Sequence, residues 1–269
     1  GVSDMVAENE LPSIVEFPEI ANYTSPDTLC TIVSSFQCLP STITVGNYAN
    51  DSGYINNLNN WVETNTTRGE LAPNSSKGPT RTGLQKPDIS ASGNVTLSAC
   101  RLAFLPFMDD SVLAYGGLHK INGGTSMASP VVAGIAALYL EKCNQSSANK
   151  FKDDLINNAY SDSFTGTLPN YGYGYGKADG FATLVATSYS PTIMNNEFCL
   201  GEDSTEVRTL TDYHSYYWSS GTTTQYSYYT PALNEHVVVS DSFGCNSDTV
   251  FFNVIEHPLP PIPTITISF

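Results

Sequence analysis

A serine stands where a short glycine-rich loop runs into an apolar segment. Residues 123–130 read GGTSMASP, and apolar residues follow to Leu140. Small residues, a hydroxyl and a proline predict a helix that begins near Ser126, where the first N–H groups lack partners and the dipole favours negative charge. Such a hydroxyl can be the nucleophile of an acyl-transfer enzyme. It can also be a simple cap, with Ser126 or Thr125 as the N-cap residue.

Four segments of the sequence favour the interpretation of Ser126 as a nucleophile over that of a simple cap. GTSMASPVVAGIAAL (124–138) resembles the serine-bearing segment of the subtilisin-like serine proteases, or subtilases. Three further segments resemble other parts of that family and stand in its order: ITVG (43–46), SSKGPTR with KPDI (75–81 and 86–89), and YGYGKADG (173–180). The resemblance covers residues 1–188. It implies that Ser126 is the nucleophile of a Ser-His-Asp triad, in an α/β three-layer domain with a mostly parallel sheet.

The other two triad members lack their motifs. Subtilases place the Asp in a D-(S/T)-G strand end and the His in an HGT helix start, both before the serine, and this chain has neither motif. His119 alone among the histidines precedes Ser126, and we expect it on the strand that enters the serine loop. We do not expect Asp88, Asp109 or Asp110 to be the triad acid. The resemblance therefore predicts the C-terminal half of a protease domain, inactive without a preceding half that carries Asp and His.

The oxyanion of an acyl-transfer reaction needs hydrogen-bond donors. The backbone N–H of Ser126 is one candidate. MVAENE (residues 5–10) resembles the family strand VVAAGNEG, whose Asn is another donor, but Glu8 replaces the usual Gly. Asn9 is therefore either an oxyanion donor or an ordinary residue of a surface loop.

Composition narrows the possible partners. The net charge is −15, from 11 basic and 26 acidic residues, which argues against nucleic acid or an anionic membrane as a partner. No apolar run is long enough to span a bilayer, and we expect the run at 127–140 to form a buried helix. No spacing of cysteine and histidine is typical of zinc, and we expect no cofactor. No calcium-ligand cluster is evident, so the residues do not support a metal site but leave calcium binding open.

A further helix is expected at 147–159, because apolar residues recur there at helical spacing. Residues 180–186 are expected to form the closing helix. A strand is expected at 42–45. Two of the six cysteines, Cys30 and Cys38, are close enough in sequence to bridge. Cys100 and Cys143 are compatible with free, buried thiols.

Composition changes after residue 188, where tyrosine, threonine, serine and valine become frequent. Strands are expected at 235–240 and 249–254. The order Cys199, Trp218, Cys245 is typical of an immunoglobulin-like (Ig-like) all-β sandwich, and the segment resembles small Ig-like repeats of secreted bacterial surface proteins. We therefore predict a Cys199–Cys245 disulfide beside Trp218, in a module that serves as a spacer or in adhesion.

The predicted domains are the protease part (1–188), the Ig-like module (189–256), and a proline-rich linker with the start of a further module (257–269). Together they predict a serine endopeptidase of polypeptides, secreted or at the bacterial cell surface. The alternative is a non-catalytic surface or adhesion protein with a degenerate subtilase-like scaffold.

Overall fold

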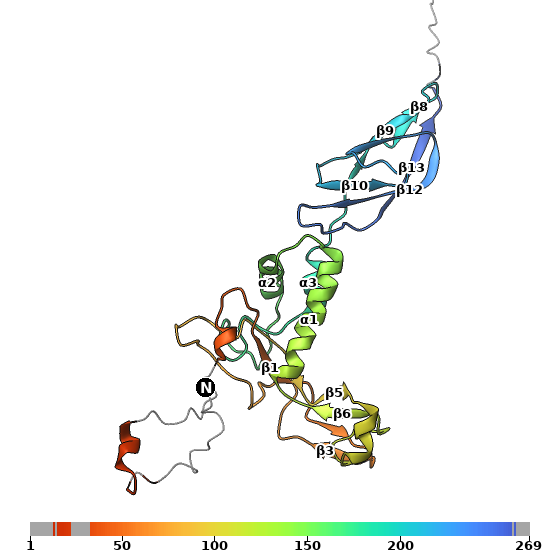
Figure 1. Ribbon diagram of the computed structural model, residues 1–269. Coiled ribbons are helices and arrows are strands. Elements are labelled where there is room, and N and C mark those ends of the chain that lie inside the picture. Colours follow the sequence, from red (N-terminus) through yellow and green to blue (C-terminus); the bar gives the residue numbers. More distant parts are fainter. Residues whose placement is uncertain (1–12, 14, 23–32, 260, 262–269) are drawn as a thin grey trace, which may run out of the picture. The chain divides into compact units, whose positions relative to one another are not determined.

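Helix α1 (Thr125–Lys142) is the longest helix among the described residues and contributes residues to two compact units (Figure 1). The computed structural model describes residues 13, 15–22, 33–259 and 261. Unit 1 comprises the described residues up to Ala137 together with Ala148–Thr183. Unit 2 comprises Leu138–Ser147 and the described residues from Leu184 onward.

The centre of unit 1 is a parallel pair, β1 (Val45–Ala49) and β4 (Ile89–Asn94), in register from Val45 opposite Ile89. Both strands are buried along most of their length. Two antiparallel pairs accompany them: β2 (Gly53–Ile55) with β3 (Trp61–Glu63), and β5 (Thr96–Ala99) with β6 (His119–Asn122). The mixed α/β class is thus confirmed, whereas the mostly parallel sheet remains a prediction.

The helices follow the sequence periodicity. Helix α2 (Ala148–Asn157) buries Phe151 and Leu155, and α3 (Gly180–Val185) is the expected short last helix. The described residues of the unit also form three short 3₁₀ helices: η3 (Pro18–Asn22), η4 (Ser35–Gln37) and η5 (Leu102–Phe107). The strand predicted at 42–45 begins only at Val45, because the N–H of Thr44 is taken by the Asp88 carboxylate.

Helix α1 is less buried than its composition predicts. Ala128, Val132 and Tyr139 are buried along one stripe, but Val131 is 39% and Leu140 46% exposed. The expectation of a fully buried helix was therefore wrong for the described residues. The physical reason is that one stripe packs within the structure, while the rest of the helix surface is also apolar and has no covering element among the described residues.

Unit 2 contains two β-sheets around a shared apolar core. One sheet has the order β10 (Ser215–Trp218), β12 (Ala232–Ser240), β13 (Val250–His257), β8 (Glu197–Cys199). The other has the order β11 (Tyr226–Tyr229), β9 (Thr205–Thr209), β7 (Ile193–Met194). Trp218 is fully buried in the core. Its ring lies edge-on to that of Phe252, with 5.9 Å between the ring centres. The predicted strands 235–240 and 249–254 thus fall within or largely overlap β12 and β13.

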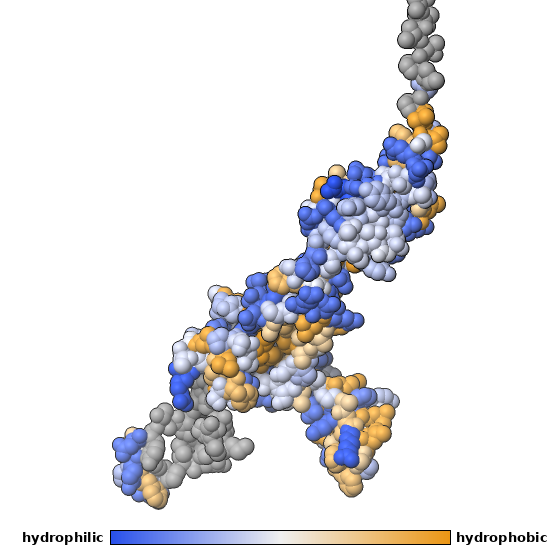
Figure 2. Space-filling model, turned by 45° about the horizontal axis from the view of Figure 1, so that its top comes forward, coloured by the Kyte–Doolittle hydropathy of each residue, from blue (hydrophilic) through white to orange (hydrophobic). Residues whose placement is uncertain are grey.

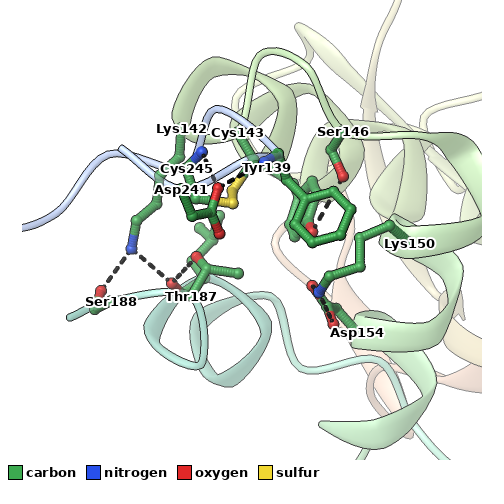
Figure 3. Close-up of a disulfide and its surroundings, with 12 residues drawn as sticks. Tyr139, Lys142, Cys143, Ser146, Lys150, Asp154, Thr187, Ser188, Asp241 and Cys245 are labelled. Atoms are coloured by element: carbon green, nitrogen blue, oxygen red, sulfur yellow. Dashed lines mark hydrogen bonds and ion pairs between the residues drawn. A yellow bond between two sulfur atoms is a disulfide. The ribbon is translucent and has the colours of Figure 1, made fainter. Parts of the chain in front are cut away.

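The predicted Cys199–Cys245 disulfide was wrong. Cys245 bonds instead to Cys143, which follows α1 (Figure 3). Cys199 is an exposed free thiol. The reason is the strand register. Cys199 lies opposite His257 at the end of β13, whereas Cys245 precedes its start, so the length of this strand, roughly 20 Å or more, separates them. The reading of Cys143 as a free thiol was therefore also wrong.

The other expectations concern Cys30, Cys38, Cys100 and the domain boundaries. Cys38 and Cys100 carry free thiols, and Cys30 lies outside the described residues. Most of the predicted linker segment 257–269 also lies outside them. The predicted domain boundaries stay predictions.

A buried ion cluster around Asp88 holds the start of the parallel pair. One carboxylate oxygen accepts from Lys86 Nζ at 2.6 Å and from the N–H of Thr44 at 2.7 Å, and the other lies 2.7 Å from Lys152 Nζ on α2. Lys86 is fully buried and also donates to the Thr42 carbonyl. The cluster joins the loop before β1, the start of β4 and α2, which assigns Asp88 a structural role.

We predict that Asp88→Asn lowers the free energy of unfolding by about 3–5 kcal/mol, because it leaves two lysine charges, one of them fully buried, without their counter-ion. Urea unfolding measures the change. The matched control is Asp153→Asn on the exposed face of α2, expected to change stability by less than about 0.5 kcal/mol. Equal effects of the two substitutions would contradict the structural role.

A second buried lysine, Lys177 of the YGYGKADG segment, joins distant loops. Its Nζ donates to Asp162 at 2.5 Å and to the Gly69 carbonyl at 2.6 Å, and it lies 4.5 Å from the centre of the Tyr48 ring. Burial raises the pKa of Asp162, but the hydrogen bonds from Lys177 and from the N–H groups of Phe164 and Thr165 outweigh it. The pKa of Asp162 is therefore held below its usual value.

This shift predicts acid sensitivity. A carboxyl whose pKa is lower in the folded than in the unfolded state stabilises the fold above its unfolded pKa of about 3.9, and this contribution disappears as the pH falls through the folded pKa. Asp162→Asn should therefore lower the melting temperature at pH 6, and the difference from wild type should shrink as the pH falls from 4 towards 2. Circular dichroism melts measure it. A difference that stays constant with pH would contradict the prediction.

Candidate active site

Ser126 lies in the first turn of α1 with its side chain exposed. Gly124 has a φ of +131°, which favours glycine, and its carbonyl accepts from the N–H groups of Met127 and Ala128. Among the described residues, neither the Thr125 nor the Ser126 N–H donates to a backbone carbonyl. These two donors are therefore available to an oxyanion beside the Ser126 hydroxyl.

A close approach between β4 and α1 positions this turn. Gly124 N–H donates to the Gly93 carbonyl at 2.8 Å. A Cβ added to Gly93 would lie 2.6 Å from Asn47 Oδ1 and 2.7 Å from both the Ala128 nitrogen and the Gly124 oxygen. Only glycine therefore allows the strand to approach the helix start this closely.

Asn47 lies on β1 and is fully buried at this contact. Its Nδ2 donates to Asn74, while its Oδ1 has no hydrogen-bond partner among the described residues. Sequence reasoning did not single out Asn47 or the role of Gly93. The visible signal was a glycine inside a strand-like segment, which often marks a close backbone approach.

A pocket of about 370 Å³ opens beside the nucleophile candidate. Its lining combines apolar and hydroxyl side chains: Thr96, Ser98, Ser126, Met127, Pro130 and Val131. Thr96 and Ser98 alternate along β5 and so face the same side of the hairpin. The Oγ1 of Thr96 is buried and has no hydrogen-bond partner among the described residues. The site is thus an exposed hydroxyl at the edge of a mainly apolar recess.

The neighbouring hydroxyl of Ser129 has a structural role. Ser129 Oγ donates to the Thr125 carbonyl at 3.0 Å, within the first turn. His119 is the first residue of β6, as expected, and Asn122 ends that strand. No described residue hydrogen-bonds to the Ser126 hydroxyl. The described chain therefore places no general base on its candidate nucleophile.

Asp109 and Asp110, which precede the serine, are engaged elsewhere. The pKa of Asp109 is lowered by hydrogen bonds from Ser111. Asp110 accepts from Asn57 at 2.7 Å. Asn9 lies outside the described residues, so its proposed place at the oxyanion remains a prediction. In the described part, no three His, Cys, Asp or Glu residues are grouped so that they could hold a metal ion.

Comparison with known proteins decides the family. Residues 9–176, which are more than half of the chain, match the Subtilase family. The chain belongs to the subtilase family. Among relatives, the serine protease AprX of Bacillus subtilis is 36% identical over 106 residues, which are 39% of this chain and 23% of AprX. The uncharacterised protein aq_aa18 of Aquifex aeolicus is 37% identical over 94 residues, 35% of this chain and 42% of that protein.

Among solved structures, the Clostridium perfringens CspB protease is similar at 27% identity with a TM-score of 0.36, over 55% of this chain and 28% of CspB. This subtilase chain therefore spans less than half the length of each of these relatives. No helix in the described residues is both long and apolar enough to cross a membrane.

We predict that Gly93→Ala displaces the first turn of α1, because the new Cβ would lie within 2.7 Å of two backbone atoms of that turn. Thermal unfolding should show a loss of stability, and a crystal structure should show residues 124–128 shifted. Gly134→Ala is the matched control on the same helix, where an added Cβ meets nothing within 4 Å. It should be neutral or stabilise by up to about 1 kcal/mol. Two equally stable variants would contradict the close approach.

Proposed function

We propose that the full-length protein is a serine endopeptidase with Ser126 as its nucleophile. The observation that carries this proposal is the exposed Ser126 hydroxyl at the start of α1, beside free N–H groups and a pocket. Ser126 also lies within the residues that match the subtilase family. In this mechanism Ser126 Oγ attacks the carbonyl carbon of a peptide bond. A histidine takes the hydroxyl proton and passes it to the departing amine, an aspartate orients the histidine, and water then releases the acyl group.

The histidine and the aspartate would come from a preceding half of the domain, which is the partner that this chain requires. Exposed apolar surface supports such a partner, because an apolar face gains stability when another element covers it. On α1 the exposed apolar side chains include Val131 and Leu140. Figure 2 shows a second accumulation around β5, β6 and β3, formed by Trp61, Leu97, Leu102, Phe104, Phe107 and Leu118.

The developing oxyanion would be held by the Ser126 N–H and by an asparagine side chain, for which Asn9 is the candidate. The pocket beside Ser126 is lined mainly by apolar groups of Met127, Pro130 and Val131. An apolar side chain of a polypeptide substrate fits this lining.

We also propose that residues 189–256 form an Ig-like sandwich and that the protein is secreted or held at the bacterial cell surface. Two sheets around one core with Trp218 at its centre support the first proposal. The Cys143–Cys245 disulfide supports the second, because disulfides persist mainly in oxidising compartments.

Hydrolysis of casein or a peptide substrate by the full-length protein tests the proposal. We expect Ser126→Ala to reduce kcat by about 10⁶-fold, the effect of losing the serine in subtilisin, a member of the same family. Ser129→Ala is the control on the same turn, and it should retain activity because its hydroxyl serves a carbonyl of the helix. Unchanged hydrolysis in Ser126→Ala would contradict the role of Ser126. A full-length protein without peptidase activity would favour the non-catalytic surface protein.

A further inference from the structure

We propose that the C-terminal module is latched onto the end of the serine-bearing helix, and is not a spacer attached through the chain alone. The latch consists of residues 142–146, at and after the end of α1, and residues 243–246, in the connection between β12 and β13. Both segments belong to unit 2. The proposal concerns the module and stands whether or not Ser126 proves catalytic.

Backbone hydrogen bonds form the first part of the latch. The Asn246 N–H donates to the Lys142 carbonyl at 3.1 Å, and the Gln145 N–H donates to the Phe243 carbonyl at 3.1 Å. The last carbonyls of a helix lack partners within the helix and need them from elsewhere. Here the module supplies a donor, the Asn246 N–H, for the Lys142 carbonyl. The pairing is that of two antiparallel strands, with Cys143 opposite Cys245.

The disulfide forms the second part, and Figure 3 shows it between the helix end and the module. Cys143 is fully buried and Cys245 is 2% exposed, so the bond is shielded from solvent. The two cysteines are 102 residues apart in sequence. A disulfide that closes so long a loop restricts the unfolded chain strongly, and it thereby stabilises the folded state relative to the unfolded one.

Side chains around the disulfide complete the contact. Lys142 Nζ donates to the Leu184 carbonyl at 2.9 Å and to Ser188 Oγ at 2.5 Å (Figure 3). The Tyr189 hydroxyl donates to the Cys245 carbonyl at 2.7 Å. The segment that enters the module is thereby tied to both halves of the latch.

Gly244 allows this close approach. Its φ of +70° favours glycine, and an added Cβ would lie 3.0 Å from the Gln145 nitrogen. A side chain at this position would therefore both strain the turn and separate the two halves. The sequence Phe243-Gly244-Cys245 thus has the residues that the contact requires.

The consequence concerns helix α1 as a whole. Its first turn carries Ser126, and its last residues are part of the module. Opening the latch should free the helix end while the sheets of the module stay folded, because their core around Trp218 contains neither cysteine.

Hydrogen exchange of the full-length protein, read by mass spectrometry, tests this inference. A phosphine reduces the disulfide by transferring two electrons; two protons from water give two thiols, and the phosphine becomes its oxide. We expect exchange in peptides with Gln145 and Asn246 to rise at least about tenfold on reduction. Exchange around Val237 and Phe252 in the core should stay unchanged.

Two variants keep the test decisive if the shielded bond resists reduction. The double substitution Cys143→Ser with Cys245→Ser should reproduce the rise in exchange, whereas Cys199→Ser should not, because that thiol is free and exposed. Gly244→Ala should raise exchange around Gln145 even with the disulfide intact. Unchanged exchange at these sites in the double variant, or a native Cys245 mapped as a free thiol, would overturn the inference. Labelling of Ser126 by an active-site probe, followed in the same samples, tests the proposed function separately.

Discussion

The close approach of β4 to the first turn of α1 determines where the candidate nucleophile can lie. Gly93 contacts Asn47, Gly124 and Ala128 at a distance that no side chain at position 93 would permit. The parallel pair of β1 and β4 therefore fixes the helix start, and the helix start fixes Ser126. The exposed hydroxyl, the two free N–H groups and the pocket at β5 lie together at this helix start.

Two buried lysines hold the strands that make this contact possible. Lys86 pairs with Asp88 at the start of β4, and Lys177 pairs with Asp162 while it lies against the Tyr48 ring of β1. Each lysine charge is compensated by a carboxylate and a backbone carbonyl, as a buried charge requires. The charged residues of the KPD and YGYGKADG segments thus stabilise the scaffold behind the serine and take no part in the proposed chemistry.

The sequence allowed some features of the fold and site to be predicted, and physical reasons explain the rest. The helix at Ser126 was predictable because small residues, a hydroxyl and a proline together signal a helix start. The burial of α1 was not, because an apolar helix says nothing of which chain covers it. The disulfide partner of Cys245 was not either, since strand register separates Cys199 from it and brings Cys143 close. The role of Gly93 depends on a contact between residues distant in sequence, which local patterns do not reveal.

The central claim is that Ser126 is the reactive serine of a subtilase. Its most direct test is to treat the full-length protein with a fluorophosphonate, which bonds covalently to an activated serine, and to locate the adduct by peptide mass spectrometry. Our account predicts one adduct, on the peptide that contains Ser126, dependent on the preceding half of the domain and absent after Ser126→Ala. An adduct on another serine, or no adduct in full-length protein that carries the family's Asp and His motifs, would contradict it.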